Sequence, residues 1–307
     1  MPKSTSVEVE VDGRTLKLSN LEKVLYPKVG FTKGQVIDYY TRIAPVLLPH
    51  LRDRPLTLKR YPNGVEGKFF YEKQCPKHRP DWVQTAPIKA RNKTIDFCLC
   101  NDLATLVWAA NLADLELHTS LSKHQRIEQP TTLAFDLDPG PPATIVECSR
   151  VALLLRDIFD SLGLEAFPKT SGSKGMQVYV PLNTDVTYDQ TKPFAKALAE
   201  LLEKQHPDLV VSSMKKELRP HKVLVDWSQN DEHKTTVNAY SLRAKERPTV
   251  STPITWDEVA SVERSGDPDE LVFDSDAALA RVEHDGDLFA PVVELEQELP
   301  ALTGARG

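Results

Sequence analysis

The spacing of hydrophobic residues along the chain switches repeatedly between the period of a strand and that of a helix. Residues 7–19 alternate apolar and polar positions around Asp12-Gly13, a pair that favours the two-residue turn of a β-hairpin. Thr32 can cap a helix over residues 33–48, because its hydroxyl can accept a hydrogen bond from the first turn. The apolar face of that helix comprises Val36, Tyr39, Tyr40, Ile43 and Leu47.

Strands and helices continue to alternate in the rest of the chain. Residues 55–75 predict a strand, a turn at Pro62-Asn63-Gly64 and a second strand, and Asp102 is expected to cap a helix over residues 103–112. The further elements expected are a strand over residues 116–119 and helices over residues 144–162 and 190–205. This order predicts an α+β fold of two sheet-based modules flanked by helices, with the active site in the cleft between them.

Two aspartates lie two positions apart at the end of an apolar run. Residues 132–135 have the composition of a strand, and its period of two places Asp136 and Asp138 on the same side. Two neighbouring carboxylates raise each other's pKa unless a cation lies between them, and oxygen-rich sites suit Mg²⁺ or Mn²⁺. From this segment alone, solvated aspartates before the Pro139-Gly140 turn explain the pattern equally well.

A third carboxylate favours the metal interpretation. Val223, Leu224 and Val225 form a second short strand-like run that ends at Asp226. Two-metal sites use several carboxylates, because each Mg²⁺ keeps waters and shares phosphate oxygens with the protein. The three aspartates therefore predict phosphoryl or nucleotidyl transfer.

The segment between these two strands is rich in glycine and hydroxyl groups. Residues 170–175 read Thr-Ser-Gly-Ser-Lys-Gly, where the glycines allow close approach of backbone N–H groups to an anion and Lys174 adds a charge. Such a loop can cradle a triphosphate, although it lacks the Walker spacing and leads into a strand. A Ser-Gly hairpin turn is the equally simple alternative.

The net charge of −6 at first argues against a nucleic-acid partner. However, residues 257–307 contain 14 acidic against 3 basic side chains, whereas residues 1–130 contain 20 basic against 14 acidic side chains, a net charge of +6. DNA would therefore lie along the N-terminal half, with the acidic end as a solvated cap packed away from DNA; an interaction tail is the alternative. Within that half, Lys23 and Lys33 beside a helix N-terminus make a plausible anion site, and a pair of solvated lysines is the alternative.

The hydropathy of the chain predicts its cellular compartment, and the compartment in turn predicts the redox state of its cysteines. The sequence contains neither a long apolar run nor the apolar stretch of a signal peptide, so we expect a cytoplasmic, nucleoid-associated protein. Its four cysteines, Cys75, Cys98, Cys100 and Cys148, are then expected to remain thiols. A zinc site formed by Cys75, His78, Cys98 and Cys100 is an unlikely alternative, because ordinary half-buried sheet explains the spacing.

Taken together, the three motifs resemble a known family. Asp136-Leu137-Asp138, Ser171-Gly172-Ser173-Lys174-Gly175 and Asp226-Trp227-Ser228-Gln229-Asn230 are similar to the motifs of the archaeo-eukaryotic primase superfamily, specifically the primase-polymerase domain of the bacterial end-joining ligase LigD. Further matching strings include residues 20–27, 59–64, 69–73, 115–118, 240–243 and 285–288. The resemblance implies one domain over residues 1–307, with DNA-end-binding residues 1–130, metal and nucleotide core residues 131–256 and acidic cap 257–307.

The resemblance also implies roles for particular residues. Two Mn²⁺ or Mg²⁺ ions would be bound by Asp136, Asp138 and Asp226. The residues implied to bind the nucleotide are His118, Ser171, Ser173, Lys174, Gly175 and Arg243, with Lys59, Arg219 and Gln229 at matching active-site positions. The residues implied to bind DNA are Asn20, Lys23 and Lys33, which match a 5′-phosphate pocket, and Phe70, which matches an aromatic ring placed against template bases. One departure is Gln177, where many relatives have His; Gln can donate to a phosphate but carries no charge.

The activity implied is template-directed addition of NTPs or dNTPs to primer ends and gap filling at 5′-phosphorylated DNA breaks in bacterial non-homologous end joining. Ku and a DNA ligase are the implied protein partners. A DNA-end binding and bridging module with dispensable catalysis is an alternative, because the 5′-phosphate pocket could work without the metals. A metal-dependent phosphohydrolase is a second alternative.

Overall fold

The chain forms two compact units, each assembled from separate stretches of sequence. The structure, a computed structural model, describes residues 6–90 and 92–301. Unit 1 takes the chain up to Gln125 together with Thr235–Thr252 and Phe273–Asp287. Unit 2 takes Arg126–Lys234, Pro253–Val272 and the chain from Leu288 onward. The mixed α+β composition predicted from the sequence is confirmed.

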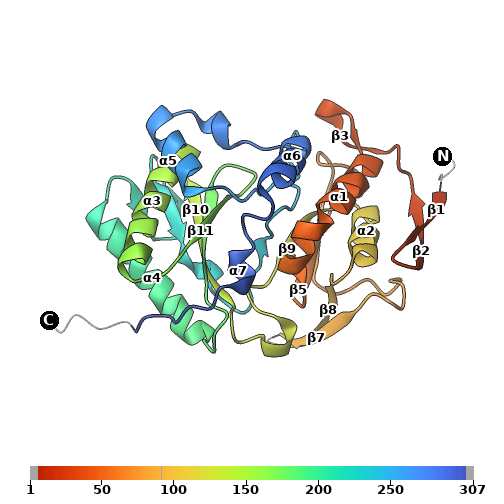
Figure 1. Cartoon of the computed structure of the whole chain (residues 1–307), viewed down its shortest axis with the longest axis horizontal. Helices are drawn as coiled ribbons and strands as arrows, with labels where there is room; N and C mark the ends of the chain where they lie inside the picture. Colours follow the sequence, from red (N-terminus) through yellow and green to blue (C-terminus); the bar gives the residue numbers. More distant parts are fainter. Residues whose placement is uncertain (1–5, 91, 302–307) are drawn as a thin grey trace. The chain divides into compact units, whose positions relative to one another are not determined.

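Unit 1 is built on a six-stranded sheet in which the order β15-β9-β5-β8-β7 is completed by β6, which pairs with β5 (Figure 1). The strands are β5 (Pro55–Arg60), β6 (Phe70–Glu72), β7 (Thr85–Lys89), β8 (Thr94–Leu99), β9 (Asp114–Thr119) and β15 (Thr236–Val237). Leu115 and Leu117 of β9 are fully buried and alternate with the polar residues that matter below. The two strands predicted within residues 55–75 are present as β5 and β6, which pair with each other.

Helices α1 (Lys33–Leu51) and α2 (Leu103–Asn111) pack against each other, and α6 (Ser275–Asp285) contacts α1. Thr32 and Asp102 cap α1 and α2 as predicted, and Gln35 completes a capping box with Thr32. The predicted hairpin is present as β1 (Ser6–Val11) and β2 (Arg14–Ser19). The remaining elements of this unit are β3 (Val24–Tyr26), β4 (Phe31–Thr32) and the short 3₁₀ helices η1 (Pro27–Val29) and η2 (His124–Arg126). The last residue of η2, Arg126, belongs to unit 2.

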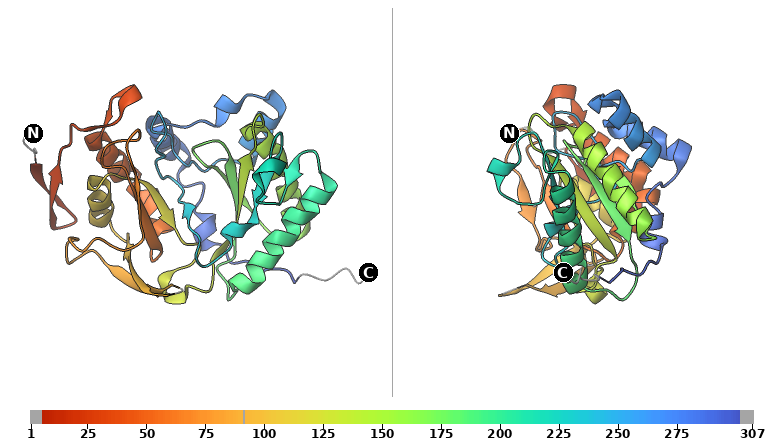
Figure 2. Two further views of the ribbon diagram at one scale, coloured as in Figure 1. Left: turned by 180° about the vertical axis from the view of Figure 1, so that it is seen from behind. Right: turned by 90° about the vertical axis from the view of Figure 1, so that its left-hand side faces the viewer.

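Unit 2 contains a five-stranded sheet in the order β11-β12-β10-β14-β13. Its strands are β10 (Thr132–Pro139), β11 (Phe167–Thr170), β12 (Met176–Pro181), β13 (Val210–Val211) and β14 (Val223–Asp226). Helices α3 (Ile145–Ser161) and α4 (Tyr188–Gln205) pack against this sheet, close to the two predicted ranges (Figure 2). The other helices of this unit are α5 (Trp256–Ser265), α7 (Pro291–Glu294), η3 (Lys216–Leu218), η4 (Trp227–Gln229) and η5 (Pro268–Leu271).

The two sides of β10 have different environments. Phe135 and Leu137 are fully buried, and the Phe135 ring lies 5.6 Å from that of Phe159 on α3. Because side chains alternate along a strand, Asp136 and Asp138 lie on the opposite side, away from this apolar contact. The packing of α3 therefore fixes the direction in which both carboxylates project.

Asn230 extends the hydrogen bonding of β10 beyond the end of β14. Its Oδ1 accepts from the backbone N–H of Ala134 at 3.0 Å, and its Nδ2 donates to the carbonyl oxygens of Ala134 and Trp227 at 2.8 and 2.9 Å. The buried amide thus takes the place of the next strand residue after the chain turns into η4. This contact holds the segment after Asp226 against β10.

Two cysteines differ from expectation. Cys75 and Cys98 form a disulfide, so the prediction of four thiols is wrong for this pair; Cys100 and Cys148 are free and buried. The backbone N–H of Cys75 donates to the Asp96 carbonyl at 2.7 Å, which brings its loop beside β8. Within residues 6–90 and 92–301, no helix is both long and apolar enough to cross a membrane.

Replacing Asn230 tests the role of this amide in the fold. Asn230→Ala is expected to lower the free energy of unfolding by about 2–3 kcal/mol, because it leaves the N–H and C=O of Ala134 without a partner in the interior. Urea denaturation followed by circular dichroism measures the change. Asn183, whose amide donates to the Val292 and Leu295 carbonyls, gives a matched control, because Asn183→Ala should leave the β10 contact intact. An Asn230→Ala variant as stable as the parent would contradict this role.

Candidate active site

Four polar residues lie in one row across four neighbouring strands of unit 2. The register pairs Lys169 of β11 with Gln177 of β12, Gln177 with Asp136 of β10, and Asp136 with Asp226 of β14. Residues directly opposite each other in antiparallel strands project to the same side of the sheet. The row therefore places the two carboxylates side by side at one end and an amide and an ammonium group at the other.

Asp136 is the most perturbed carboxyl group of this row. Burial, then the neighbouring charge of Asp226, raise its pKa to about 6, although a hydrogen bond from Gln177 Nε2 to Asp136 Oδ1 at 3.1 Å opposes the shift. Like charges held close in a poorly solvated place disfavour ionisation. A cation between the two carboxylates would remove this penalty.

The carboxylate of Asp226 is oriented by its own turn. Its Oδ1 accepts from the backbone N–H and the hydroxyl of Ser228 at 2.8 and 2.6 Å, and its Oδ2 accepts from Gln229 Nε2 at 3.0 Å. The motif Asp-Trp-Ser-Gln-Asn thus holds its first residue through its third and fourth. Gln229, predicted at the active site, is in direct contact with Asp226.

Asp138 lies one pleat beyond Asp136 in a more exposed position. Its side chain is 53% exposed and its Oδ2 lies 3.4 Å from Arg219 Nη1, while Arg219 Nη2 donates to the Met214 carbonyl at 2.7 Å. Such an exposed pair contributes little to stability. In the part of the chain that the structure describes, no three His, Cys, Asp or Glu side chains are gathered closely enough to hold a metal ion alone. Any metal bound here would therefore complete its coordination with oxygens from outside the protein.

The loop between β11 and β12 is a closed turn. Ser171 Oγ accepts from the backbone N–H groups of Ser173 and Gly175, both at 3.2 Å, and Gly172 has a positive φ of 65°. The hydroxyl thus occupies two N–H groups that we expected to face an anion. A Cβ on Gly175 would meet the Leu137 carbonyl at 2.0 Å, so this position must be glycine for close approach to β10. Ser173 and Lys174 are exposed at the tip of the turn.

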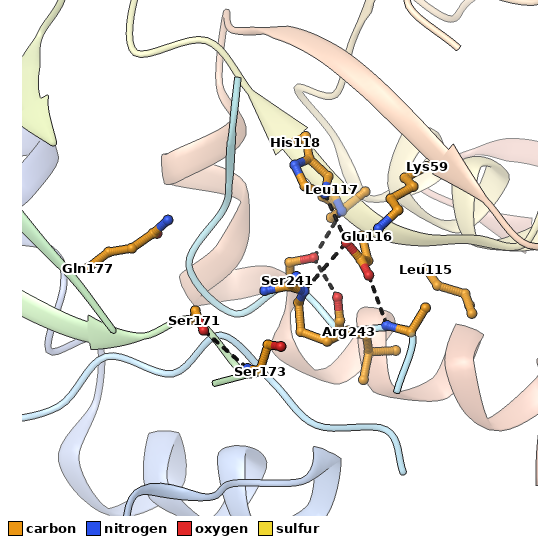
Figure 3. Close-up of polar contacts among 12 residues, drawn as sticks. Lys59, Leu115, Glu116, Leu117, His118, Ser171, Ser173, Gln177, Ser241 and Arg243 are labelled. Atoms are coloured by element: carbon orange, nitrogen blue, oxygen red, sulfur yellow. Dashed lines mark hydrogen bonds and ion pairs between the residues drawn. The ribbon is translucent and has the colours of Figure 1, made fainter. Parts of the chain in front are cut away.

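A second polar cluster, in unit 1, is centred on Glu116 of β9 (Figure 3). Its Oε2 lies 2.9 Å from Lys59 Nζ, 3.0 Å from His118 Nε2 and 3.4 Å from Arg243 Nε, and its Oε1 accepts from the backbone N–H of Ala244 at 3.0 Å. Lys59 is opposite Glu116 in the sheet, and His118 lies on the same side two residues along β9. Three predicted site residues therefore meet on one carboxylate.

The charges of this cluster are set by that carboxylate. Burial alone would raise the pKa of Glu116, but the His118 hydrogen bond and the charges of Arg243 and Lys59 outweigh it and hold the pKa well below its usual value. Burial lowers the pKa of His118 despite the neighbouring Glu116, so the imidazole is neutral at pH 7. Because an ionised carboxylate only accepts, His118 Nε2 carries the proton and Nδ1 the lone pair.

Aromatic rings surround Lys59 and extend to the surface. Lys59 Nζ lies between 5.1 and 5.5 Å from the ring centroids of Tyr61, Phe69 and Tyr71, within cation–π range. Phe69, Phe70 and Tyr71 are about half exposed, so their rings are accessible from outside the protein. Beside Tyr71 lies a pocket of about 700 Å³ whose lining includes Arg60, Lys73, Lys77 and Lys93.

The residues expected to hold a 5′-phosphate are also close together in unit 1. Lys33 Nζ donates to the Ser19 carbonyl at 2.6 Å, and burial, then the charge of Lys23, lower its pKa to about 8. The first N–H groups of α1 are already bonded to the carbonyl oxygens of Lys23 and Leu21. The expected contribution of the helix N-terminus to an anion site is therefore wrong in this structure, whereas the two lysines are neighbours. Asn20 is exposed beside them, with a positive φ of 53°.

Sequence reasoning missed Glu116 and Lys169 as site residues. The position of Glu116 could have been predicted from His118. The two residues are two positions apart on an expected strand, and this spacing places both side chains on one side. No pattern in the sequence indicates a role for Lys169, because its neighbours Phe167 and Pro168 indicate only a segment that leads into the loop. Its place depends on the register of β11 against β12.

The chain is similar to proteins of bacterial end joining. Residues 32–289 match the family model described as LigD, primase-polymerase domain. The multifunctional non-homologous end joining protein LigD of Mycolicibacterium smegmatis is 40% identical over 279 residues, which cover 90% of this chain and 36% of that protein. The bifunctional non-homologous end joining protein LigD of Bacillus subtilis is 32% identical over 247 residues, which cover 80% of this chain and 40% of that protein. The chain thus spans well under half the length of these relatives.

A solved structure gives the same result. The polymerase domain from Mycobacterium tuberculosis ligase D in complex with DNA matches with a TM-score of 0.85 and 38% identity, covering 92% of this chain and 99% of that one. At this level of identity the match extends beyond fold to family. The resemblance recognised in the three motifs is confirmed.

The cost of holding Asp136 ionised can be measured. Asp136→Asn should raise the free energy of unfolding at pH 7.5 by about 1–3 kcal/mol, because the charge of this half-buried carboxylate beside Asp226 is removed. The pKa of Asp136 is higher in the folded than in the unfolded state, so the folded parent binds this proton more tightly. The free energy of unfolding of the parent therefore rises relative to that of the variant as pH falls from 6 towards 4. Urea denaturation at several pH values measures both. Asp138→Asn, at an exposed position, should change stability by less than about 0.5 kcal/mol. An Asp136→Asn variant less stable than the parent at pH 7.5 would contradict the electrostatic account.

Proposed function

Because the chain belongs to the LigD primase-polymerase domain family, we propose that it is a template-directed nucleotidyltransferase. It adds NTPs or dNTPs to primer ends and fills gaps at 5′-phosphorylated DNA breaks in bacterial non-homologous end joining. The observation that carries this proposal is the pairing of Asp136 with Asp226 across β10 and β14. Burial and the neighbouring charge of Asp226 raise the pKa of Asp136, so this pair of carboxylates is suited to share a cation and unsuited to a purely structural role.

The reaction follows from this pair of carboxylates. The 3′-hydroxyl of a primer attacks the α-phosphorus of the nucleotide, a new P–O bond forms, and the bond to the leaving pyrophosphate breaks. Two Mn²⁺ or Mg²⁺ ions, when bound, would activate the hydroxyl and neutralise the charge that develops on the phosphate oxygens. Asp136, Asp226 and the more exposed Asp138 are the residues that would hold them. Their all-oxygen donor set fits hard divalent cations, and the nucleotide's phosphates would supply the missing ligands.

Each unit offers contacts for the nucleotide. In unit 2, the exposed Ser173 and Lys174 can bind phosphate oxygens without disturbing the turn that Ser171 closes. Arg219, next to Asp138, is a further candidate. In unit 1, the lone pair on His118 Nδ1 can accept a hydrogen bond from a sugar hydroxyl, and the Glu116 carboxylate holds Arg243 and Lys59 in place.

DNA is proposed to bind the cationic surface of unit 1. Lys23 and Lys33, with Asn20, would hold the 5′-phosphate, and the exposed Phe70 ring could stack on template bases. The lysine-rich pocket beside Tyr71 suits a phosphate backbone. Ku and a DNA ligase are the proposed protein partners, since the relatives' names place them in non-homologous end joining.

A primer-extension assay tests the proposal directly. On gapped, 5′-phosphorylated DNA with NTPs or dNTPs and Mn²⁺ or Mg²⁺, the parent is expected to extend the primer according to the template, whereas Asp136→Ala and Asp226→Ala reduce extension to the level without enzyme. Asp160→Ala, on the exposed side of α3, is the matched control and should extend normally.

The same assay separates the alternatives. Binding of 5′-phosphorylated ends without extension by the parent would favour the end-bridging module. Release of nucleotide products without a template would favour a phosphohydrolase. Extension that persists in both aspartate variants would contradict the proposed chemistry.

The pKa of Lys33 near 8 predicts a pH dependence of DNA-end binding. A phosphate dianion favours the protonated lysine, so the preference for 5′-phosphate over 5′-hydroxyl ends should fall by about threefold to tenfold between pH 7 and pH 9. Fluorescence anisotropy with the two DNA ends measures this ratio. Lys33→Met should remove the preference at every pH, whereas Lys28→Met, at a solvated pair with Glu246, should retain it. A preference that is unchanged up to pH 9 would exclude Lys33 from the phosphate site.

A further inference from the structure

We propose that Lys169 is a positioning residue that orients Asp136 through the amide of Gln177. This inference rests on the proposed function, since its consequence is the geometry of a metal-binding carboxylate. Lys169 is fully buried in β11 and occupies the end of the polar row opposite to Asp226.

The orientation of the amide follows from its neighbours. Lys169 Nζ donates to Gln177 Oε1 at 2.6 Å, and the Tyr179 hydroxyl lies 3.5 Å from the same oxygen. An ammonium group has only donors, so the amide oxygen must face Lys169. The amide nitrogen then faces Asp136 Oδ1 at 3.1 Å and can only donate to it. Without the ammonium group, the amide could rotate and present its oxygen to the carboxylate.

The free-energy cost of burying the Lys169 ammonium group indicates that this residue does more than fill space in the core. Burying an ammonium group costs several kcal/mol unless partners compensate, and an apolar residue of similar size would fill the same space more favourably. The Lys169 ammonium lies 5.5 Å from the centroid of the Tyr179 ring, and its charge also favours ionisation of Asp136. The polar row is thus a chain of donors that ends on one oxygen of Asp136 and leaves the other oxygen available.

The identity of residue 177 fits this arrangement. The Gln177 amide accepts from Lys169 at its oxygen and donates to Asp136 at its nitrogen. A neutral imidazole at this position could likewise accept at one nitrogen and donate at the other. Gln177→His is therefore the conservative variant, and Gln177→Met, which removes both hydrogen bonds at similar size, is the disruptive one.

A double-mutant cycle tests the inference. Lys169→Met and Gln177→Met should each lower kcat for primer extension by about 10–100-fold with less than about a threefold change in KM for the nucleotide. The double variant should be no worse than either single variant, because both break the same chain of contacts. Gln177→His should retain most of the parent's kcat. Lys192→Met, which removes an ion pair with Asp231 elsewhere in unit 2, is the control and should leave kcat unchanged.

Two further measurements do not depend on activity. Binding of Mn²⁺, followed by electron paramagnetic resonance, should weaken by about tenfold or more in Lys169→Met. In nuclear magnetic resonance spectra, the Gln177 side-chain amide protons should exchange faster with solvent in that variant than in the parent. Circular dichroism melts establish that the variants are folded.

The outcomes distinguish this inference from the proposed function. If the parent extends primers and binds Mn²⁺, and Lys169→Met does both equally well, the positioning role is overturned while the polymerase proposal stands. Additive losses in the double variant would also overturn it, because they indicate independent effects. If the parent shows no extension, the Mn²⁺ and amide-exchange measurements still decide the role of Lys169.

Discussion

The site depends on the repulsion between two carboxylates that the fold holds side by side. Asp136 and Asp226 are directly opposite in the register of β10 and β14, and burial, then the neighbouring charge of Asp226, raise the pKa of Asp136 to about 6. A fold selected for stability alone would place an uncharged residue at one of these positions. Under the proposed function, a cation bound between the two carboxylates would offset this repulsion.

Several contacts keep this pair in place, and they come from ordinary structural rules. The apolar side of β10 packs on α3 through Phe135, so its other side must project the aspartates. Asn230 bonds to Ala134 as a substitute strand residue, which holds the turn that orients Asp226. Gly175 permits the closed loop to approach Leu137. The contacts that stabilise this part of the fold therefore surround the two carboxylates, whereas the carboxylates themselves do not stabilise it.

In unit 1 the buried carboxylate has cationic neighbours instead of an acidic one. Its central carboxylate, Glu116, is surrounded by Lys59, His118 and Arg243, so its pKa is depressed and it stays ionised. It then acts as an anchor that fixes one ring nitrogen of His118 as a donor and leaves the other as an acceptor. The two clusters illustrate how burial has opposite consequences for a carboxyl group with acidic neighbours and for one with cationic neighbours.

Local signals in the sequence predicted much of this arrangement. The caps at Thr32 and Asp102, the Asp12-Gly13 turn and the strands that end at Asp136 and Asp226 all follow from short-range rules, and the three motifs were sufficient to recognise the family. The partners of those motifs were not predictable in the same way. Lys169 reaches Asp136 only through the register of three strands, and Cys75 meets Cys98 only because its loop folds beside β8.

The most direct test of this account is the location of a bound metal. Crystals grown with Mn²⁺ and a non-hydrolysable nucleoside triphosphate analogue would locate the ion by its anomalous scattering. The account predicts a peak that shares oxygen ligands from Asp136, Asp226 and the triphosphate, with Gln177 still bonded to the other oxygen of Asp136. A nucleotide-bound structure whose Mn²⁺ is ligated by neither aspartate would contradict it.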